Sequence, residues 1–99
     1  MNKYLLKLYV AGQTIRSGRA IANAQRICDN ELKGLAELII IDILERPEVA
    51  EEEKILATPT LIRHLPPPLR RMIGDLSDTN EVLMGLDLHY DGAGLPTDK

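Results

Sequence analysis

The segment Tyr4–Val10, YLLKLYV, decides the fold of this 99-residue chain. It is apolar and rich in residues that favour strands. Alternate positions put Leu6, Leu8 and Val10 on one face, and the other face is apolar except for Lys7. Because a strand that is apolar on both faces suits the middle of a sheet, we expect this strand to be a central one.

A helix and a second strand are predicted to follow. Ser17 is placed as the N-cap of a helix that runs to about residue 33, and Gly34 as its C-terminal stop. The run LIIIDI at residues 38–43 is apolar and β-branched, which predicts a second buried strand. Strand, helix and strand with short connections predict a parallel, right-handed βαβ unit. The apolar stripe of the helix consists of Ala20, Ile21, Ala24, Ile27, Cys28 and Leu32.

Prolines guide the prediction after residue 46. Pro47 suits the first turn of a short helix over residues 47–54. Residues 57–62 are predicted to form a strand that is entered through Pro59. The LPPP run at residues 65–68 must be extended or a turn.

Two later segments fit two kinds of secondary structure. In residues 69–76 the apolar side chains are spaced as in a helix, but the segment could also be a strand that ends at Gly74. In residues 82–90 they alternate as in a strand, although a helix is also possible, weakened at Gly85 by about 1 kcal/mol relative to Ala. A capping signal at residues 77–78 separates the two segments. The helical set of the first segment is Leu69, Met72, Ile73 and Leu76, and the alternating set of the second is Val82, Met84, Leu86, Leu88 and Tyr90.

Composition limits the class of protein. The chain has no Phe or Trp, so Leu, Ile and Val must build a small core. Its net charge of -3 argues against a general nucleic-acid binder. We see no signal peptide and no apolar run long enough to span a membrane, so we expect a cytoplasmic protein. We expect one domain over residues 1–90 and a flexible tail over residues 91–99.

No catalytic or metal-binding constellation emerges from the residues, and no cofactor is predicted. Cys28 is the only cysteine and lies on the apolar stripe, which excludes CxxC chemistry and predicts a core role. His64 and His89 do not make a metal site with a single cysteine. Thr58-Pro59 before a strand, in a chain that opens strand–helix–strand, resembles the thioredoxin fold. Because residues 12–17, after the first strand, contain no cysteine, thioredoxin-type redox catalysis is excluded.

Five blocks of the sequence form a recognisable set: KLYVAG (7–12), KILATPTL (54–61), LPPPLRR (65–71), IGDLS (73–77) and GLDL (85–88). They resemble the KaiB family, whose members are components of the cyanobacterial circadian clock. The blocks stand in the family's order, and the resemblance covers residues 3–90.

The resemblance implies a metamorphic α/β fold related to thioredoxin. In the family the first half is constant, whereas the second half exchanges helix and strand between a resting homodimer or homotetramer and a rarer thioredoxin-like monomer. The monomer binds the N-terminal ATPase ring of KaiC, favours KaiC dephosphorylation, captures KaiA in cyanobacteria, and competes with a sensor histidine kinase for the ring. The resemblance therefore implies a regulatory binding protein that is not an enzyme.

Candidate residues follow from the matched blocks and from the ambiguous segments. We expect the partner-binding surface to be basic and at a strand edge rather than in a pocket. Its candidates are Lys54, Arg70, Arg71, Tyr4 and Arg19. The prolines are expected to slow the exchange of folds, since uncatalysed X-Pro isomerisation takes about tens to hundreds of seconds. The fold-switch candidates are Pro59, Pro66, Pro67, Pro68, Gly85 and Asp87.

The chain departs from the family pattern at Ile15, where the family often has proline after Gly-x-Thr, and in its short tail. Both differences point to a homologue outside the core cyanobacterial clock, so KaiA need not be among its partners. Two alternatives stay open. One is a KaiB paralogue that acts in stress response with a different partner, and the other is a divergent thioredoxin-fold enzyme.

Overall fold

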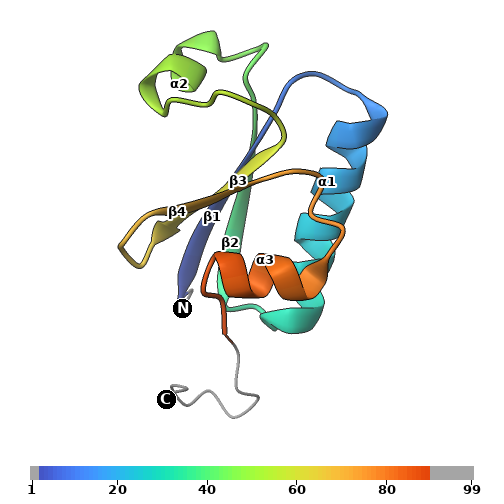
Figure 1. Cartoon of the computed structure of the whole chain (residues 1–99), viewed down its shortest axis with the longest axis vertical. Helices are drawn as coiled ribbons and strands as arrows, with labels where there is room; N and C mark the ends of the chain where they lie inside the picture. Colours follow the sequence, from blue (N-terminus) through green and yellow to red (C-terminus); the bar gives the residue numbers. More distant parts are fainter. Residues whose placement is uncertain (1–2, 90–99) are drawn as a thin grey trace.

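β1 (Tyr4–Val10) lies inside a four-stranded sheet of order β2-β1-β3-β4, as its two apolar faces predict. The computed structural model describes residues 3–89 (Figure 1). β2 (Ala36–Asp42) is parallel to β1, and the intervening α1 (Ile15–Arg26) continues into a π-helical turn, η1 (Ile27–Glu31). The predicted parallel βαβ unit is therefore confirmed.

The first helix begins earlier than predicted. Its N-cap is Thr14, whose hydroxyl oxygen accepts a hydrogen bond from the backbone N–H of Ser17 at 3.0 Å. The predicted cap at Ser17 is wrong because Thr14 supplies the acceptor and Ser17 lies buried inside the helix. The predicted stop is confirmed, since Lys33 and Gly34 take positive φ angles of 50° and 84° after η1.

The second half takes one of the two arrangements that the sequence left open. α2 (Pro47–Glu52) begins at the predicted proline. β3 (Thr60–Leu65) begins later than predicted, because the ladder starts only after Pro59, which has no N–H to donate. β4 (Arg70–Ile73) pairs antiparallel with β3, and α3 (Thr79–Gly85) follows. The helical last segment is the form expected of the thioredoxin-like state.

Asp78 caps α3 at the predicted position, because its carboxylate accepts a hydrogen bond from the backbone N–H of Glu81 at 3.1 Å. Tyr90 and the predicted flexible tail at residues 91–99 lie outside the described residues. Within residues 3–89, no helix combines the length and the apolarity that crossing a membrane requires.

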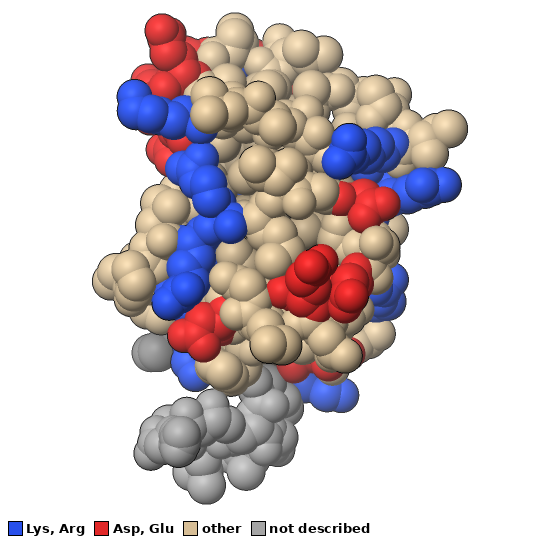
Figure 2. Space-filling view, in the orientation of Figure 1, with Lys and Arg blue, Asp and Glu red and all other residues tan. Residues whose placement is uncertain are grey.

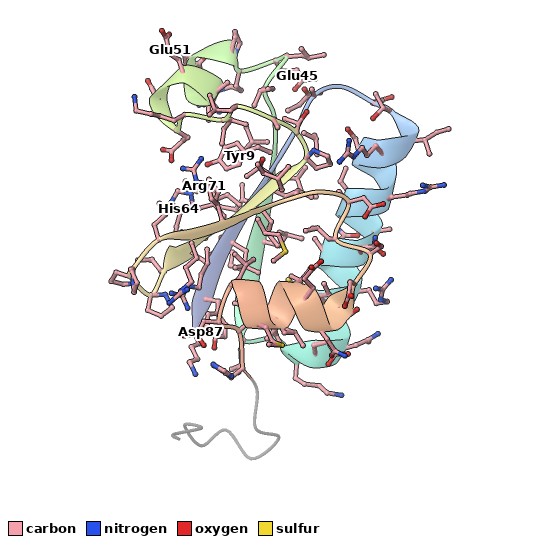
Figure 3. All side chains as sticks on the ribbon, viewed as in Figure 1. Tyr9, Glu45, Glu51, His64, Arg71 and Asp87 are labelled. Atoms are coloured by element: carbon pink, nitrogen blue, oxygen red, sulfur yellow. The ribbon has the colours of Figure 1, made fainter. Side chains whose placement is uncertain are left out.

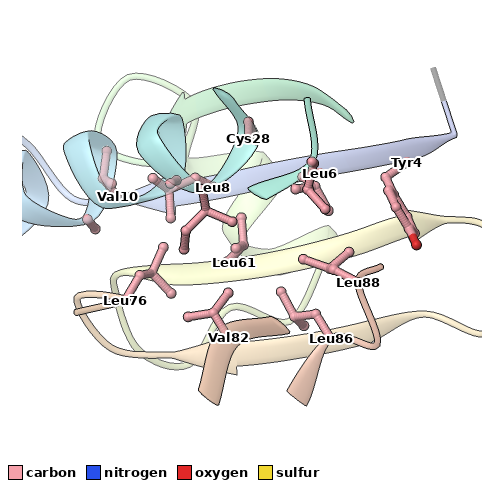
Figure 4. Packing of buried hydrophobic residues seen from close by; sticks show 14 residues of the cluster. Tyr4, Leu6, Leu8, Val10, Cys28, Leu61, Leu76, Val82, Leu86 and Leu88 are labelled. Atoms are coloured by element: carbon pink, nitrogen blue, oxygen red, sulfur yellow. The ribbon is translucent and has the colours of Figure 1, made fainter. Parts of the chain in front are cut away.

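The main core lies between the sheet and the layer formed by α1, η1 and α3 (Figure 4). The predicted helical stripe is buried there, although Ile21 is only partly covered. Burial raises the pKa of the Cys28 thiol to about 11, in keeping with its predicted core role. The sheet and the second half complete this core with Tyr4, Leu6, Leu8, Val10, Leu61, Leu76, Val82, Leu86 and Leu88.

A smaller core lies on the opposite face of the sheet. Tyr9 and Ile62 point to this face from β1 and β3, and Val49 of α2 packs on them. α2 therefore covers one end of this face, next to the turn that leads into β3 (Figure 1).

Replacing Ile15 by proline is expected to stabilise the fold. Ile15 is the first residue of α1, where the N–H has no intrahelical partner, and its side chain is 79% exposed. Thr14 already has the extended backbone, φ -116° and ψ 167°, that a following proline requires. We expect Ile15→Pro to raise the free energy of unfolding by about 0.4–1 kcal/mol through the entropy of the unfolded chain. Thermal unfolding of Ile15→Pro, with Ile15→Ala as the control, measures this gain in stability. A proline variant that is less stable than the alanine variant would contradict the prediction.

Tyr9 predicts a loss of stability at alkaline pH. Burial raises the pKa of its phenol to about 12, with Glu53 adding to the shift and Arg71 opposing it. An unfolded tyrosine titrates near pH 10, so the stabilisation is present below about pH 10 and is lost as the pH rises to about 12. When the pH is raised from about 8 to about 11, we expect the free energy of unfolding of Tyr9→Phe to fall by about 1.4 kcal/mol less than that of the parent. Urea titrations at both pH values test this, and equal losses would contradict it.

Candidate functional site

β4 is an edge strand of four residues that carries two consecutive arginines. In its antiparallel register Arg70 lies opposite Arg63, and Arg71 lies opposite Ile62. Because neighbouring residues of a strand point to opposite faces, the two arginines leave the edge on different sides of the sheet. β4 thus presents positive charge along an exposed edge, where it also discourages unwanted strand pairing.

Arg71 fixes the turn after α2 beside β4. Its Nη1 and Nη2 donate hydrogen bonds to the backbone carbonyls of Lys54 and Glu53, both at 3.1 Å. Lys54, which has a φ of 56°, is thereby held next to the edge strand. Figure 2 shows Lys and Arg side chains in a column along this side of the molecule. We call Lys54, Arg70 and Arg71 the basic strip.

The strip borders a polar pair on the sheet face. The Tyr9 hydroxyl and His64 Nε2 are 3.3 Å apart, and both side chains lie near Arg71 (Figure 3). Burial lowers the pKa of His64, and the charges of Lys7 and Arg71 lower it further against the opposing effect of Glu53. A neutral His64 therefore accompanies the basic strip at neutral pH.

Asp87 lies beyond the end of α3 in a left-handed conformation, with a φ of 53°. The hydrogen bond with His89 is the main cause that lowers the pKa of its carboxyl, and Arg63 and Arg70 add to this.

An open hollow of about 420 Å³ lies at the α2 end of the basic strip. It is lined by Pro47, Ala50, Glu51, Lys54, Ile55 and Leu56.

Two predicted partner-binding residues are not brought to the basic strip. Tyr4 is only 2% exposed in this conformation, and its role in partner binding stays a prediction. Its hydroxyl instead accepts a hydrogen bond from the backbone N–H of His89 at 2.9 Å and donates one to the His89 carbonyl at 3.2 Å, which ties β1 to the segment after α3. Arg19 is exposed on α1, in the helix layer.

The fold-switch candidates lie at joints of the second half. Pro59 is buried before β3, and residues 66–68 form the exposed turn from β3 to β4. The Thr58–Pro59, Leu65–Pro66 and Pro67–Pro68 peptide bonds are cis. Gly85 is the last residue of α3. Their part in an exchange of folds stays a prediction.

Sequence reasoning missed Arg63, which is buried on the core face of β3. Its guanidinium donates hydrogen bonds to the backbone carbonyls of Pro68 and Asp87. The signal was present, because Arg63 follows Leu61 by two residues and must share its face. It was hidden because the predicted strand ended at residue 62.

The described part of the chain shows no metal-binding cluster, since no three His, Cys, Asp or Glu side chains gather within residues 3–89. The thiol of Cys28 is buried in the core rather than placed at the start of α1. The candidate site is the charged edge of the sheet at β4.

Solved structures establish the fold class. The N-terminal domain of Synechococcus elongatus SasA is 22% identical, has a TM-score of 0.71, and aligns over 93% of this chain and 90% of that domain. Mitochondrial thioredoxin 3 from Saccharomyces cerevisiae is 17% identical, with a TM-score of 0.69 over 88% of this chain and 79% of that one. The fold is α/β and thioredoxin-like.

Sequence comparisons establish the family. The KaiB domain model matches residues 7–88. Circadian clock protein KaiB3 of Synechocystis sp. (strain ATCC 27184 / PCC 6803 / Kazusa) is 54% identical over 92 residues, which are 93% of this chain and 90% of that protein. The circadian clock oscillator protein KaiB of Prochlorococcus marinus (strain MIT 9312) is 59% identical over 88 residues, 89% of this chain and 84% of that protein. The chain therefore belongs to the KaiB family of circadian clock proteins.

Proposed function

We propose that this chain is a non-catalytic regulator that binds the N-terminal ATPase ring of a KaiC-type ATPase and promotes its dephosphorylation. Binding is controlled by an exchange between a resting homodimer or homotetramer and the thioredoxin-like monomer, which is the binding form. KaiA or a sensor histidine kinase are the further partners of such a system. Family membership supports the proposal, and two features of the chain add to it.

The pattern of exposed apolar residues carries the fold-switching part of the proposal. Leu69 and Ile73 belong to the helical set of residues 69–76, yet they are 48% and 58% exposed in β4 and the turn before it. Met84 belongs to the alternating set of residues 82–90, yet it is 80% exposed on α3. Within residues 66–89, the exposed large apolar side chains are thus Leu69, Ile73 and Met84, and each belongs to the apolar set of its segment's alternative assignment. A second arrangement that buries these side chains accounts for apolar residues at positions that are exposed in this one.

The basic strip supports the binding part of the proposal. It combines three cations with a short strand edge and an adjoining open hollow, and Arg71 holds Lys54 in place through two backbone carbonyls. Charges arranged in this way steer an acidic partner surface and fix its register.

Reversing charge on the basic strip should weaken binding to the ATPase ring. Lys54 and Arg70 are exposed, and neither side chain is needed for the core, so Lys54→Glu with Arg70→Glu should leave the fold intact. We expect the dissociation constant to rise more than about tenfold, mainly through lost charge complementarity. A binding titration with the ATPase ring in the presence of ATP measures this.

The matched control is the pair Arg16→Glu and Lys33→Glu, which changes the net charge equally at exposed positions in the helix layer. An equal loss of affinity in both double variants would mean that net charge alone matters. Unchanged affinity in the strip variant would remove Lys54 and Arg70 from the interface.

Gly85→Ala should increase the population of the thioredoxin-like form. A Cβ at Gly85 would clash with the terminal methyl group of Met72, which is the far end of a flexible side chain and can shift away. The helix gains about 1 kcal/mol, which raises a small competent fraction and the apparent affinity roughly fivefold. Asp87 is a less clear probe, because its carboxylate contacts His89 and lies 3.9 Å from Arg63 in this form.

Gly18→Ala provides the control for Gly85→Ala. Gly18 lies in α1, and a Cβ there would meet nothing within 4 Å, so the substitution strengthens a helix of the constant half. It should stabilise both forms alike and leave the association rate unchanged. Size-exclusion chromatography and stopped-flow binding distinguish the two variants. If Gly85→Ala keeps the parent's oligomeric state and association rate, the proposed exchange between two folds is contradicted.

A further inference from the structure

Arg63 occupies a place where the pattern calls for an apolar residue. It lies on β3 two residues after Leu61, on the face that α3 covers, and only 3% of its surface is exposed. Isolated charges are costly to bury unless hydrogen bonds and opposite charges compensate. The contacts of this guanidinium therefore identify what keeps it there.

Both arms of the Arg63 guanidinium bind main-chain carbonyls. Nη2 donates to the Pro68 carbonyl at 2.8 Å, in the turn that leads into β4. Nη1 donates to the Asp87 carbonyl at 3.1 Å, just beyond the end of α3. The nearest carboxylate oxygen, Oδ2 of Asp87, is 3.9 Å away and belongs to a half-exposed side chain. Among residues 3–89, Nε has no hydrogen-bond partner.

One acceptor, Pro68, immediately precedes the first segment of ambiguous periodicity, and the other, Asp87, lies in the second. One carbonyl is fixed only when the β3–β4 hairpin forms, and the other only when α3 ends where it does. A cation buried between them is satisfied only if both elements are in place. Losing either acceptor would leave a buried charge with even fewer partners, so the two elements reinforce one another through Arg63.

We propose that Arg63 is a positioning residue that couples the β3–β4 hairpin to α3, so that the strand bearing Arg70 and Arg71 becomes ordered together with the helix. The consequence for binding rests on the proposed function. In this scheme the partner recognises the basic strip, and Arg63 couples β4 to α3 in addition to the direct packing of Met72 against α3.

Amide hydrogen exchange of the isolated full chain tests the coupling without any partner. Arg63→Met keeps an unbranched apolar side chain but removes the guanidinium, with both hydrogen bonds and the charge. We expect exchange in β4 and in α3 to accelerate together by about tenfold or more, the effect of losing a hydrogen bond to a charged group. Exchange in α1 and β1 should change much less. Acceleration confined to β4, or no acceleration, would overturn the proposal.

Two further variants keep this test decisive. Arg63→Lys retains the charge and can donate to a carbonyl but lacks the fork that reaches two, so it should give intermediate protection in both segments. If Arg63→Met does not fold, hydrogen exchange of Arg63→Lys still tests the coupling. Arg16→Met removes the same charge from an exposed position of α1 and should leave both segments as in the parent.

A titration with the KaiC-type ATPase ring separates this inference from the proposed function. If exchange accelerates in both segments and affinity falls by a similar factor, both hold. If exchange accelerates in both segments but affinity is unchanged, the coupling stands and the thioredoxin-like form is not the binding form.

Discussion

The fold depends on apolar side chains from the end of the described chain that close the core over β1 and β3. Leu76, Val82, Leu86 and Leu88 are all buried there. Each such side chain contributes roughly 1.5–3 kcal/mol on burial, so together they approach the whole stability of a small domain. A chain without Phe or Trp has little else with which to cover the sheet. Any second arrangement of residues 66–89 must therefore bury these side chains again, and a subunit interface is one place where it could do so.

The first half of the fold could be predicted from the sequence because its signals are local and agree. β1 is apolar on both faces, the helical stripe has one period, and the glycine after η1 stops the helix. In the second half the local signals conflict. Residues 69–76 carry a helical stripe, yet residues 70–73 form a strand, because pairing with β3 brings Met72 opposite Leu61 on the core face. That pairing is a long-range contact, which periodicity within one segment cannot reveal.

The candidate site was predicted as far as charge and edge position allow. Lys54, Arg70 and Arg71 came from the matched family blocks. Arg71 lies beside Lys54 because it binds the carbonyls of the turn after α2, whereas Arg70 leaves β4 on the other face of the sheet, and their part in partner binding stays a prediction. Tyr4 and Arg63 could not be assigned in this way. Both are polar side chains whose partners are backbone groups far away in the sequence, at His89 and Asp87. Such roles become visible only when the topology has brought the segments together.

Backbone strain accompanies the joints of this arrangement. Among residues 3–89, four residues other than glycine have positive φ angles, and three of them, Lys54, Leu76 and Asp87, lie before β3, between β4 and α3, and after α3. A left-handed conformation costs a residue other than glycine roughly 1–3 kcal/mol, and a leucine has no side-chain polar group to offset it. The buried guanidinium of Arg63 adds a desolvation cost that two carbonyls only partly compensate. Large apolar burial in the second half thus opposes the desolvation of Arg63 and most of the left-handed backbone strain, which lie in the same half. Under the proposed function this balance sets the fraction of the chain in the binding form, and the apparent affinity for the partner falls in proportion to that fraction.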